Sequence, residues 1–166
     1  MNATQTPQKR AKSLVPLSKE HHFGLLFCWK LKQGIKHQTD LNIMRAYVRY
    51  FWENVLKDHC TEEEWLVARL LPTDHVVRLQ LEEEHRLLQK LIELIEEGSP
   101  MNKSLFEVLD KDLTAHIRWE ERELFPYLQS VVPAEDLELA ASVLQHNHNP
   151  RQDAFSPEFW LSKGAA

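Results

Sequence analysis

The chain has 166 residues, 43% of them hydrophobic and 27% charged, which is the balance of one soluble globular domain. Its formal net charge of −5, with acidic and basic residues interspersed, excludes the basic stripe of a nucleic-acid binder and the polybasic patch of a membrane-surface protein. No apolar run approaches the roughly 18 residues of a membrane span, and the polar N-terminus lacks the apolar segment of a secretory signal. We therefore expect a cytoplasmic protein, and a monomer or weak dimer.

Helix-forming residues fill long stretches of the chain, and only four glycines interrupt them. The sequence thus predicts an all-α protein. Turn-forming residues divide it into four main helices and a shorter fifth one, at about residues 17–35, 40–70, 74–97, 100–125 and 133–147. Asp40, Asp74 and Ser99 are suitable N-caps.

The two ends of the chain are expected to differ. Residues 1–13 are predicted to be disordered, residues 14–150 to form the helical domain, and residues 151–166 to form an irregular tail. Phe155, Phe159 and Trp160 should pack this tail against the helices. Cys28 and Cys60 are too few for a disulfide framework and too far apart for a CxxC motif, so both are expected to be reduced packing residues.

One arrangement of donor residues occurs twice: a Glu-His pair opens an apolar stretch, and His-x-x-x-Glu follows further along. The first copy is Glu20-His21 with His59 and Glu63, and the second is Glu84-His85 with His116 and Glu120. Imidazole nitrogen and carboxylate oxygen are the donors that iron, manganese and zinc prefer. The repeat therefore predicts a buried pair of metal ions.

Helical periodicity places these donors on apolar stripes. At about 100° per residue, His116 and Glu120 share an arc with the leucines at 105, 109, 113 and 124. His59 and Glu63 share a similar arc with Trp52, which could line the pocket. A buried carboxylate needs a compensating cation, and a metal pair would supply it.

Some assignments stay open. His22 is an alternative to His21, although His21 shares more of its side with apolar residues. Glu20 or Glu84 could orient an imidazole from behind. Glu64 and Glu121 are rotated by about 100° from the proposed ligands, so they are expected to be exposed or paired with arginines such as Arg69 and Arg118. The remaining histidines in loops or near helix ends, His37, His75, His146 and His148, are expected to be solvated.

Taken together, these segments resemble the hemerythrin-like, or HHE cation-binding, family. The resemblance rests on Leu17-Ser-Lys-Glu-His21, on His59-Cys-Thr-Glu-Glu63-Glu64, on Glu84-His85-Arg and on the run from His116 to Pro126. It implies an antiparallel up-down-up-down four-helix bundle around a non-haem di-iron centre. It also implies that Glu63 and Glu120 bridge the metals and that His21, His59, His85 and His116 are terminal ligands.

The functional expectation follows from the resemblance and from one departure. Oxygen-carrying hemerythrin has a further histidine one turn after that of its third helix, where this chain has Gln89. Two metals, iron or else manganese or zinc, are expected to meet dioxygen, peroxide or nitric oxide for sensing, scavenging or iron handling. The alternatives are a di-iron oxidoreductase with peroxide or organic-reductant turnover and a metal-switched adaptor with an unknown partner protein.

Overall fold

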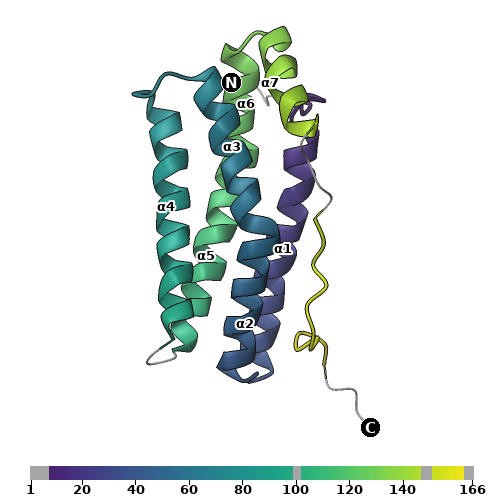
Figure 1. The fold of residues 1–166 in the computed structure, drawn as a ribbon, viewed down its shortest axis with the longest axis vertical. Coiled ribbons are helices and arrows are strands. Elements are labelled where there is room, and N and C mark those ends of the chain that lie inside the picture. Colours follow the sequence, from purple (N-terminus) through teal and green to yellow (C-terminus); the bar gives the residue numbers. More distant parts are fainter. Residues whose placement is uncertain (1–7, 99–101, 147–150, 163–166) are drawn as a thin grey trace, which may run out of the picture.

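The structure is a computed structural model, and it describes residues 8–98, 102–146 and 151–162. Every regular element within these ranges is a helix. Figure 1 shows long helical segments lying side by side along the long axis of the molecule. They are α1 (Val15–Lys36), α2 (Leu41–Phe51), η1 (Trp52–Leu56), α3 (Lys57–Leu70), α4 (Val76–Glu97), α5 (Lys103–Trp119), η2 (Glu120–Leu124) and α6 (Phe125–Val131), and a shorter helix, α7 (Ala134–His146), follows. In the part of the chain that is described, no helix combines the length and apolar character required to cross a membrane.

Helix starts are set by local capping, and the predicted caps are met in part. Asp40 accepts a hydrogen bond from the Asn42 amide, as predicted. The cap of α4 is His75 instead of Asp74, because the His75 ring nitrogen Nδ1 accepts from the Val77 amide. The cap of α5 is Asn102. The predicted cap at position 99 lies outside the described residues.

Two single π-helical turns interrupt otherwise continuous helices. In η1 the Lys57 amide donates to the Trp52 carbonyl, and in η2 the Phe125 amide donates to the Glu120 carbonyl, five residues back in each case. The segments α2, η1 and α3 thus follow one another without a break, as do α5, η2 and α6. The prediction that the latter helix ends at 125 is wrong: it continues to Val131, because Pro126 lies in the first turn of α6, where a missing N–H is tolerated.

The core consists of two apolar clusters with a polar layer between them. One cluster includes Phe27, Leu88 and Leu113, and the other includes Leu66 and Leu124. Along each long helical segment, the candidate ligands lie where residues of the first cluster give way to residues of the second. The candidate site is therefore enclosed at both ends by apolar packing.

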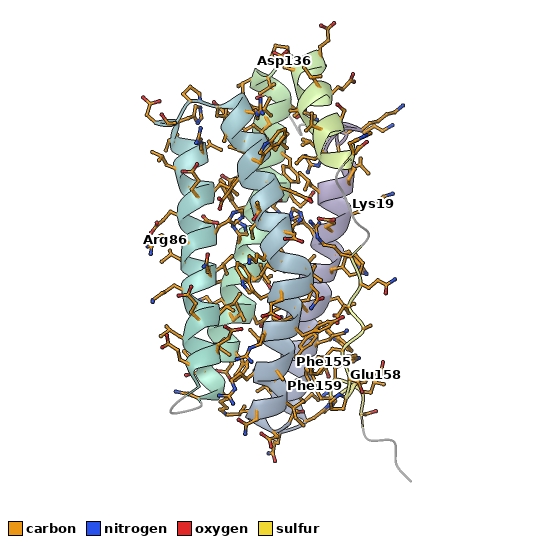
Figure 2. All side chains as sticks on the ribbon, viewed as in Figure 1. Lys19, Arg86, Asp136, Phe155, Glu158 and Phe159 are labelled. Carbon is orange, nitrogen blue, oxygen red and sulfur yellow. The ribbon has the colours of Figure 1, made fainter. Side chains whose placement is uncertain are left out.

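Both ends of the described chain lie against the helices. Residues 8–13 differ from the expected disorder, since Arg10 binds Glu121 and the Ala11 amide donates to Gln129. In the tail, Asp153 accepts from Tyr47 at 2.5 Å and pairs with the buried Lys30 at 2.9 Å. The tail aromatics Phe155, Phe159 and Trp160 pack around the Tyr47 ring, and Figure 2 shows Phe155 and Phe159 beside the helices.

Candidate metal centre

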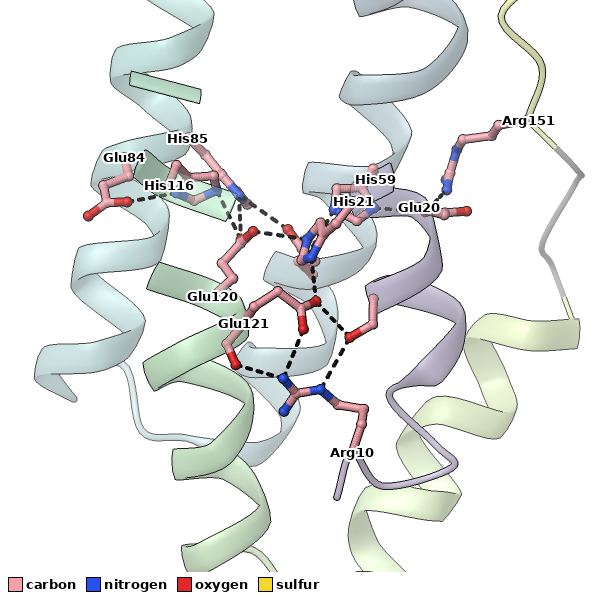
Figure 3. Close-up of polar contacts among 12 residues, drawn as sticks. Arg10, Glu20, His21, His59, Glu84, His85, His116, Glu120, Glu121 and Arg151 are labelled. Atoms are coloured by element: carbon pink, nitrogen blue, oxygen red, sulfur yellow. Dashed lines mark hydrogen bonds and ion pairs between the residues drawn. The ribbon is translucent and has the colours of Figure 1, made fainter. Parts of the chain in front are cut away.

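The structure brings the six predicted ligands together in the interior. His21 comes from α1, His59 and Glu63 from α3, His85 from α4, His116 from α5 and Glu120 from the first position of η2. All six are buried, with exposed fractions of 5% or less. Figure 3 shows the side chains of His21, His59, His85, His116 and Glu120 converging from different helices.

The donor atoms form two overlapping groups that could each hold a metal ion. His21 and His59 belong to one group, His85 and His116 belong to the other, and Glu63 and Glu120 belong to both. Within each group the donor atoms lie within 4.8 Å of one another. The His59 Nε2 is 3.0 Å from Glu63 Oε1, and the His116 Nε2 is 2.9 Å from Glu120 Oε1, so the two His-x-x-x-Glu motifs hold ring and carboxylate at nearly the same distance.

Each histidine is oriented from behind by a further carboxylate. The Nδ1 atoms of His59 and His116 lie 2.7 Å from Glu20 and Glu84, respectively. Sequence reasoning named these two glutamates as possible orienting residues. A carboxylate that accepts from Nδ1 holds the ring in the tautomer whose Nε2 faces the site.

The other two orienting carboxylates are Glu64 and Glu121, a role that was not predicted for them. Glu64 accepts from His85 Nδ1 at 2.8 Å, and Glu121 accepts from His21 Nδ1 at 2.7 Å. Glu121 pairs with an arginine as expected, although the partner is Arg10, and the Glu64 side chain is 42% exposed. The rotation of about 100° from the bridging glutamate directs each carboxylate to a histidine on a neighbouring helix. The signal in the sequence was the repeat itself, because both copies read His-x-x-x-Glu-Glu.

The arrangement has internal two-fold symmetry. Glu20 supports His59 as Glu84 supports His116, and Glu121 supports His21 as Glu64 supports His85. The ring pairs match as well: the His21 and His59 centroids are 5.0 Å apart, the His85 and His116 centroids are 4.8 Å apart, and both pairs are edge-on. The repeat seen in the sequence is therefore a repeat of geometry.

Electrostatics favour a fully ionised centre in the metal-free chain. Burial opposes charge on the histidines, but the facing carboxylates more than offset it, so the pKa values of His59 and His116 rise to about 9. Burial and the neighbouring Glu63 oppose ionisation of Glu120, yet His116 and His21 lower its pKa to about 2. In the same way, burial is outweighed by His59 and His21 at Glu63, whose pKa lies well below its ordinary value. Protons on the imidazoles thus occupy the electrostatic role that metal ions would take.

The orphaned polar atoms show that metal ions fit the donor set. His59 Nε2, His85 Nε2, Glu63 Oε2 and both Glu120 carboxylate oxygens are buried without a hydrogen bond of good geometry. Buried polar atoms are otherwise nearly always satisfied. These atoms face one another across the site, and a cation among them would satisfy all of them at once.

The other histidines are placed as follows. His22 is exposed and points away from the buried face on which His21 lies. His37 and His75, expected to be solvated, are only partly exposed: His37 Nδ1 lies 3.3 Å from the Phe159 carbonyl, and His75 Nε2 lies 2.8 Å from the Tyr127 hydroxyl. His146 is exposed, and the histidine at position 148 lies outside the described residues.

A small cavity borders the site. The centre of a water-sized molecule has about 10 Å³ of space there, which is room for about one such molecule. His21, His59, His116, Glu20 and Glu120 line one side of it, and an apolar wall closes the rest, formed by Gly24, Phe51, Val55, Leu56, Cys60, Leu113 and Ile117.

The residues of this wall correct one prediction and agree with another. Phe51, and not the predicted Trp52, lines the cavity. The extra residue of the π turn η1 rotates the preceding helix, α2, relative to His59. Cys60 and Cys28 are free and buried, as predicted, and burial raises the pKa of the Cys28 thiol to about 12.

Comparisons of the chain with protein-family models, with curated proteins and with solved structures found no match. The functional argument therefore depends on the residues of the site.

Proposed function

We propose that the chain is a hemerythrin-like protein whose centre binds two metal ions, most suitably iron. In this proposal α1, α2–η1–α3, α4 and α5–η2–α6 are the four members of an antiparallel up-down-up-down bundle. The observation that carries the proposal is the pair of donor groups that share Glu63 and Glu120. A fully buried, symmetric set of four imidazoles and two carboxylates has no evident structural role without a cation.

The donor set also favours a reactive centre. A metal at either position would be held by two imidazole nitrogens and by one oxygen from each shared glutamate, which makes four protein donors. Iron commonly takes six ligands, so each position would keep room for further ones, and a bound iron pair would supply one-electron redox chemistry and affinity for small oxygen or nitrogen ligands. Nitrogen and oxygen donors would also accept manganese or zinc.

The cavity favours a small ligand. Its space of about 10 Å³ and its apolar wall suit a molecule of the size and polarity of dioxygen or nitric oxide, and peroxide is close to this size. The residues of the wall exclude bulk water from the donor atoms, and Glu20 accepts the proton of His59 Nδ1. A sensing, scavenging or iron-handling role uses these features directly.

The alternative functions are weighed by the same features. An organic reductant does not fit a cavity of this size, so an oxidoreductase of this architecture would have to receive electrons from outside it. Peroxide turnover by the iron-loaded protein would favour that alternative. Capture of a partner only by the metal-loaded protein would favour a metal-switched adaptor.

Metal analysis combined with absorption spectroscopy tests the proposal. Protein reconstituted with ferrous iron and exposed to air should bind two irons per chain and show the near-ultraviolet absorption of an oxo-bridged ferric pair. Nitric oxide added to the reduced, ferrous protein should change the absorption spectrum of that reduced protein. A chain that binds no iron, or whose spectrum does not respond to any of the three small molecules, would contradict the proposal.

A further inference from the structure

We propose that the two metal positions are inequivalent and that Arg10 and Arg151 make them so, with the position at His21 and His59 the easier one to reduce. The inference rests on the proposed function. The donor set repeats with two-fold symmetry, but the surroundings of the four orienting carboxylates do not. Both arginines lie on the same half of the centre, as Figure 3 shows.

Arg151 acts on the His59 side. Its Nη1 contacts Glu20 Oε2, and this is the same oxygen that accepts the proton of His59 Nδ1. Its Nη2 lies 2.9 Å from Glu62, and its side chain is only 6% exposed. The guanidinium thus competes directly with the imidazole for one oxygen, in a place that water screens little.

Arg10 acts on the His21 side. Its Nη2 lies 2.9 Å from Glu121 Oε2, and the Ser18 hydroxyl donates to Glu121 Oε1 at 2.6 Å, beside the His21 ring. Arg10 also donates to the Glu121 main-chain carbonyl at 2.6 Å. That carbonyl is available because the Phe125 amide donates to the Glu120 carbonyl instead, and the next residue, Pro126, has no N–H to donate.

The other half of the centre has no such cations. Glu84 accepts from His116 and from the neutral amide of Gln80, and Glu64 accepts from His85. Within the described ranges, no lysine or arginine forms an ion pair with Glu64 or Glu84. Their side chains are 42% and 30% exposed, so water screens them in part but contributes no positive charge.

The difference in charge has a defined chemical effect. A carboxylate without a cation draws the Nδ1 proton more strongly, which makes the imidazole a better electron donor and favours the higher charge on its metal. An arginine on the carboxylate weakens this effect and adds positive charge nearby. When a diferric pair accepts one electron from a reductant such as dithionite, the ferrous ion should lie at His21 and His59, and the ferric ion at His85 and His116.

The position that is easier to reduce also has the larger share of its ligands at the cavity: both His21 and His59 line that space, whereas of the other pair His116 does and His85 does not. The arginines would therefore direct the electron to the metal that has both of its histidines at the cavity.

A redox titration of charge variants tests the inference. Arg151→Gln removes the charge but keeps a hydrogen-bond donor, and Arg151→Lys keeps the charge. The first reduction of the iron-loaded protein is followed by the paramagnetic resonance signal of the mixed-valence state. At a fixed potential, the ferric-to-ferrous ratio should rise about tenfold in Arg151→Gln, which equals 59 mV for one electron, and should stay near the parent value in Arg151→Lys.

Matched variants make the result decisive. Arg10→Gln should shift the ratio in the same direction, and it provides the test if Arg151→Gln fails to fold. Arg86→Gln is the control, because Arg86 follows His85 in sequence but, among the described residues, forms its ion pair only with the exposed Glu83. An unchanged ratio in both arginine variants, or an equal shift in the control, would overturn the inference. Iron content separates the two proposals: a full iron pair without the shift refutes only this inference, whereas a chain without iron refutes both.

Discussion

His21 and His22 are adjacent in sequence, and replacing each with alanine gives a closely matched test of the site. His21 is 4% exposed and contacts Glu63, Glu120 and Glu121, whereas His22 is exposed. His21→Ala should reduce the metal content from two ions to at most one. Without metal, removing one partner from a buried ionic group costs about 3–5 kcal/mol, which corresponds to a fall of about 6–20 °C in Tm for a chain of this size.

Metal adds a second, independent measurement. Free metal at about 100 times its Kd would stabilise the native state by about 2.7 kcal/mol for each occupied site, and this raises the Tm. The parent protein and His22→Ala should show this rise in Tm on metal addition, and His21→Ala should lose at least half of it. Metal content by mass spectrometry and thermal unfolding with and without metal provide both values. Equal effects of the two substitutions, or two metals retained in His21→Ala, would refute the assignment of the α1 ligand.

Three further predictions concern pH, the cavity and the tail. Because the pKa values of His59 and His116 are raised from 6.5 to about 9, their contribution to the stability of the metal-free protein is complete below pH 6.5 and is lost as pH rises through about 9. Urea unfolding across this window should show the loss, and the metal-loaded protein should not. Gly24→Ala places a Cβ 2.6 Å from Ile117 Cδ1, so this variant should bind nitric oxide more slowly while it retains two metals. Ile117→Val should not slow binding, and its free energy of unfolding should fall by about 0.5–1.5 kcal/mol. Stopped-flow absorption and unfolding measure these effects, and equal binding rates in the two variants would contradict the assigned cavity. Asp153→Asn leaves the buried Lys30 of α1 without its counter-ion, so the free energy of unfolding should fall by about 3–5 kcal/mol. Limited proteolysis should then cut the tail faster, and an unchanged cleavage rate would show that this ion pair does not hold the tail.

The ligand positions could be predicted because helical periodicity and donor chemistry agree at each of them. His116 and Glu120 are one turn apart on a stripe of buried leucines, and the structure places both in the interior. Such a pattern needs no knowledge of neighbouring helices. The same holds for the Asp40 cap, which depends only on the next two residues.

The orienting role of Glu64 and Glu121 depends on neighbouring helices, and so periodicity alone did not predict it. A helical-wheel projection shows that each side chain points away from the buried apolar stripe, but it does not show that a histidine of an adjacent helix lies in that direction. The π turns are a related case. Their five-residue hydrogen bonds form in segments with ordinary helical composition, and one extra residue was enough to exchange Trp52 for Phe51 at the cavity.

The π turn at Glu120 connects the centre to the beginning of the chain. Glu120 is the first residue of this turn, and the turn shifts the Phe125 amide to the Glu120 carbonyl. Because Pro126 then offers no N–H to the Glu121 carbonyl, Arg10 binds it, and the same guanidinium reaches the carboxylate that orients His21. Glu63 lies within the regular helix α3, so its half of the repeat lacks this device, and Glu64 has no cation among the described residues. The symmetry of the donors and the asymmetry of their surroundings thus have separate structural origins: the first lies in the repeated motif, and the second lies in one π turn, one proline and the two segments that flank the helices.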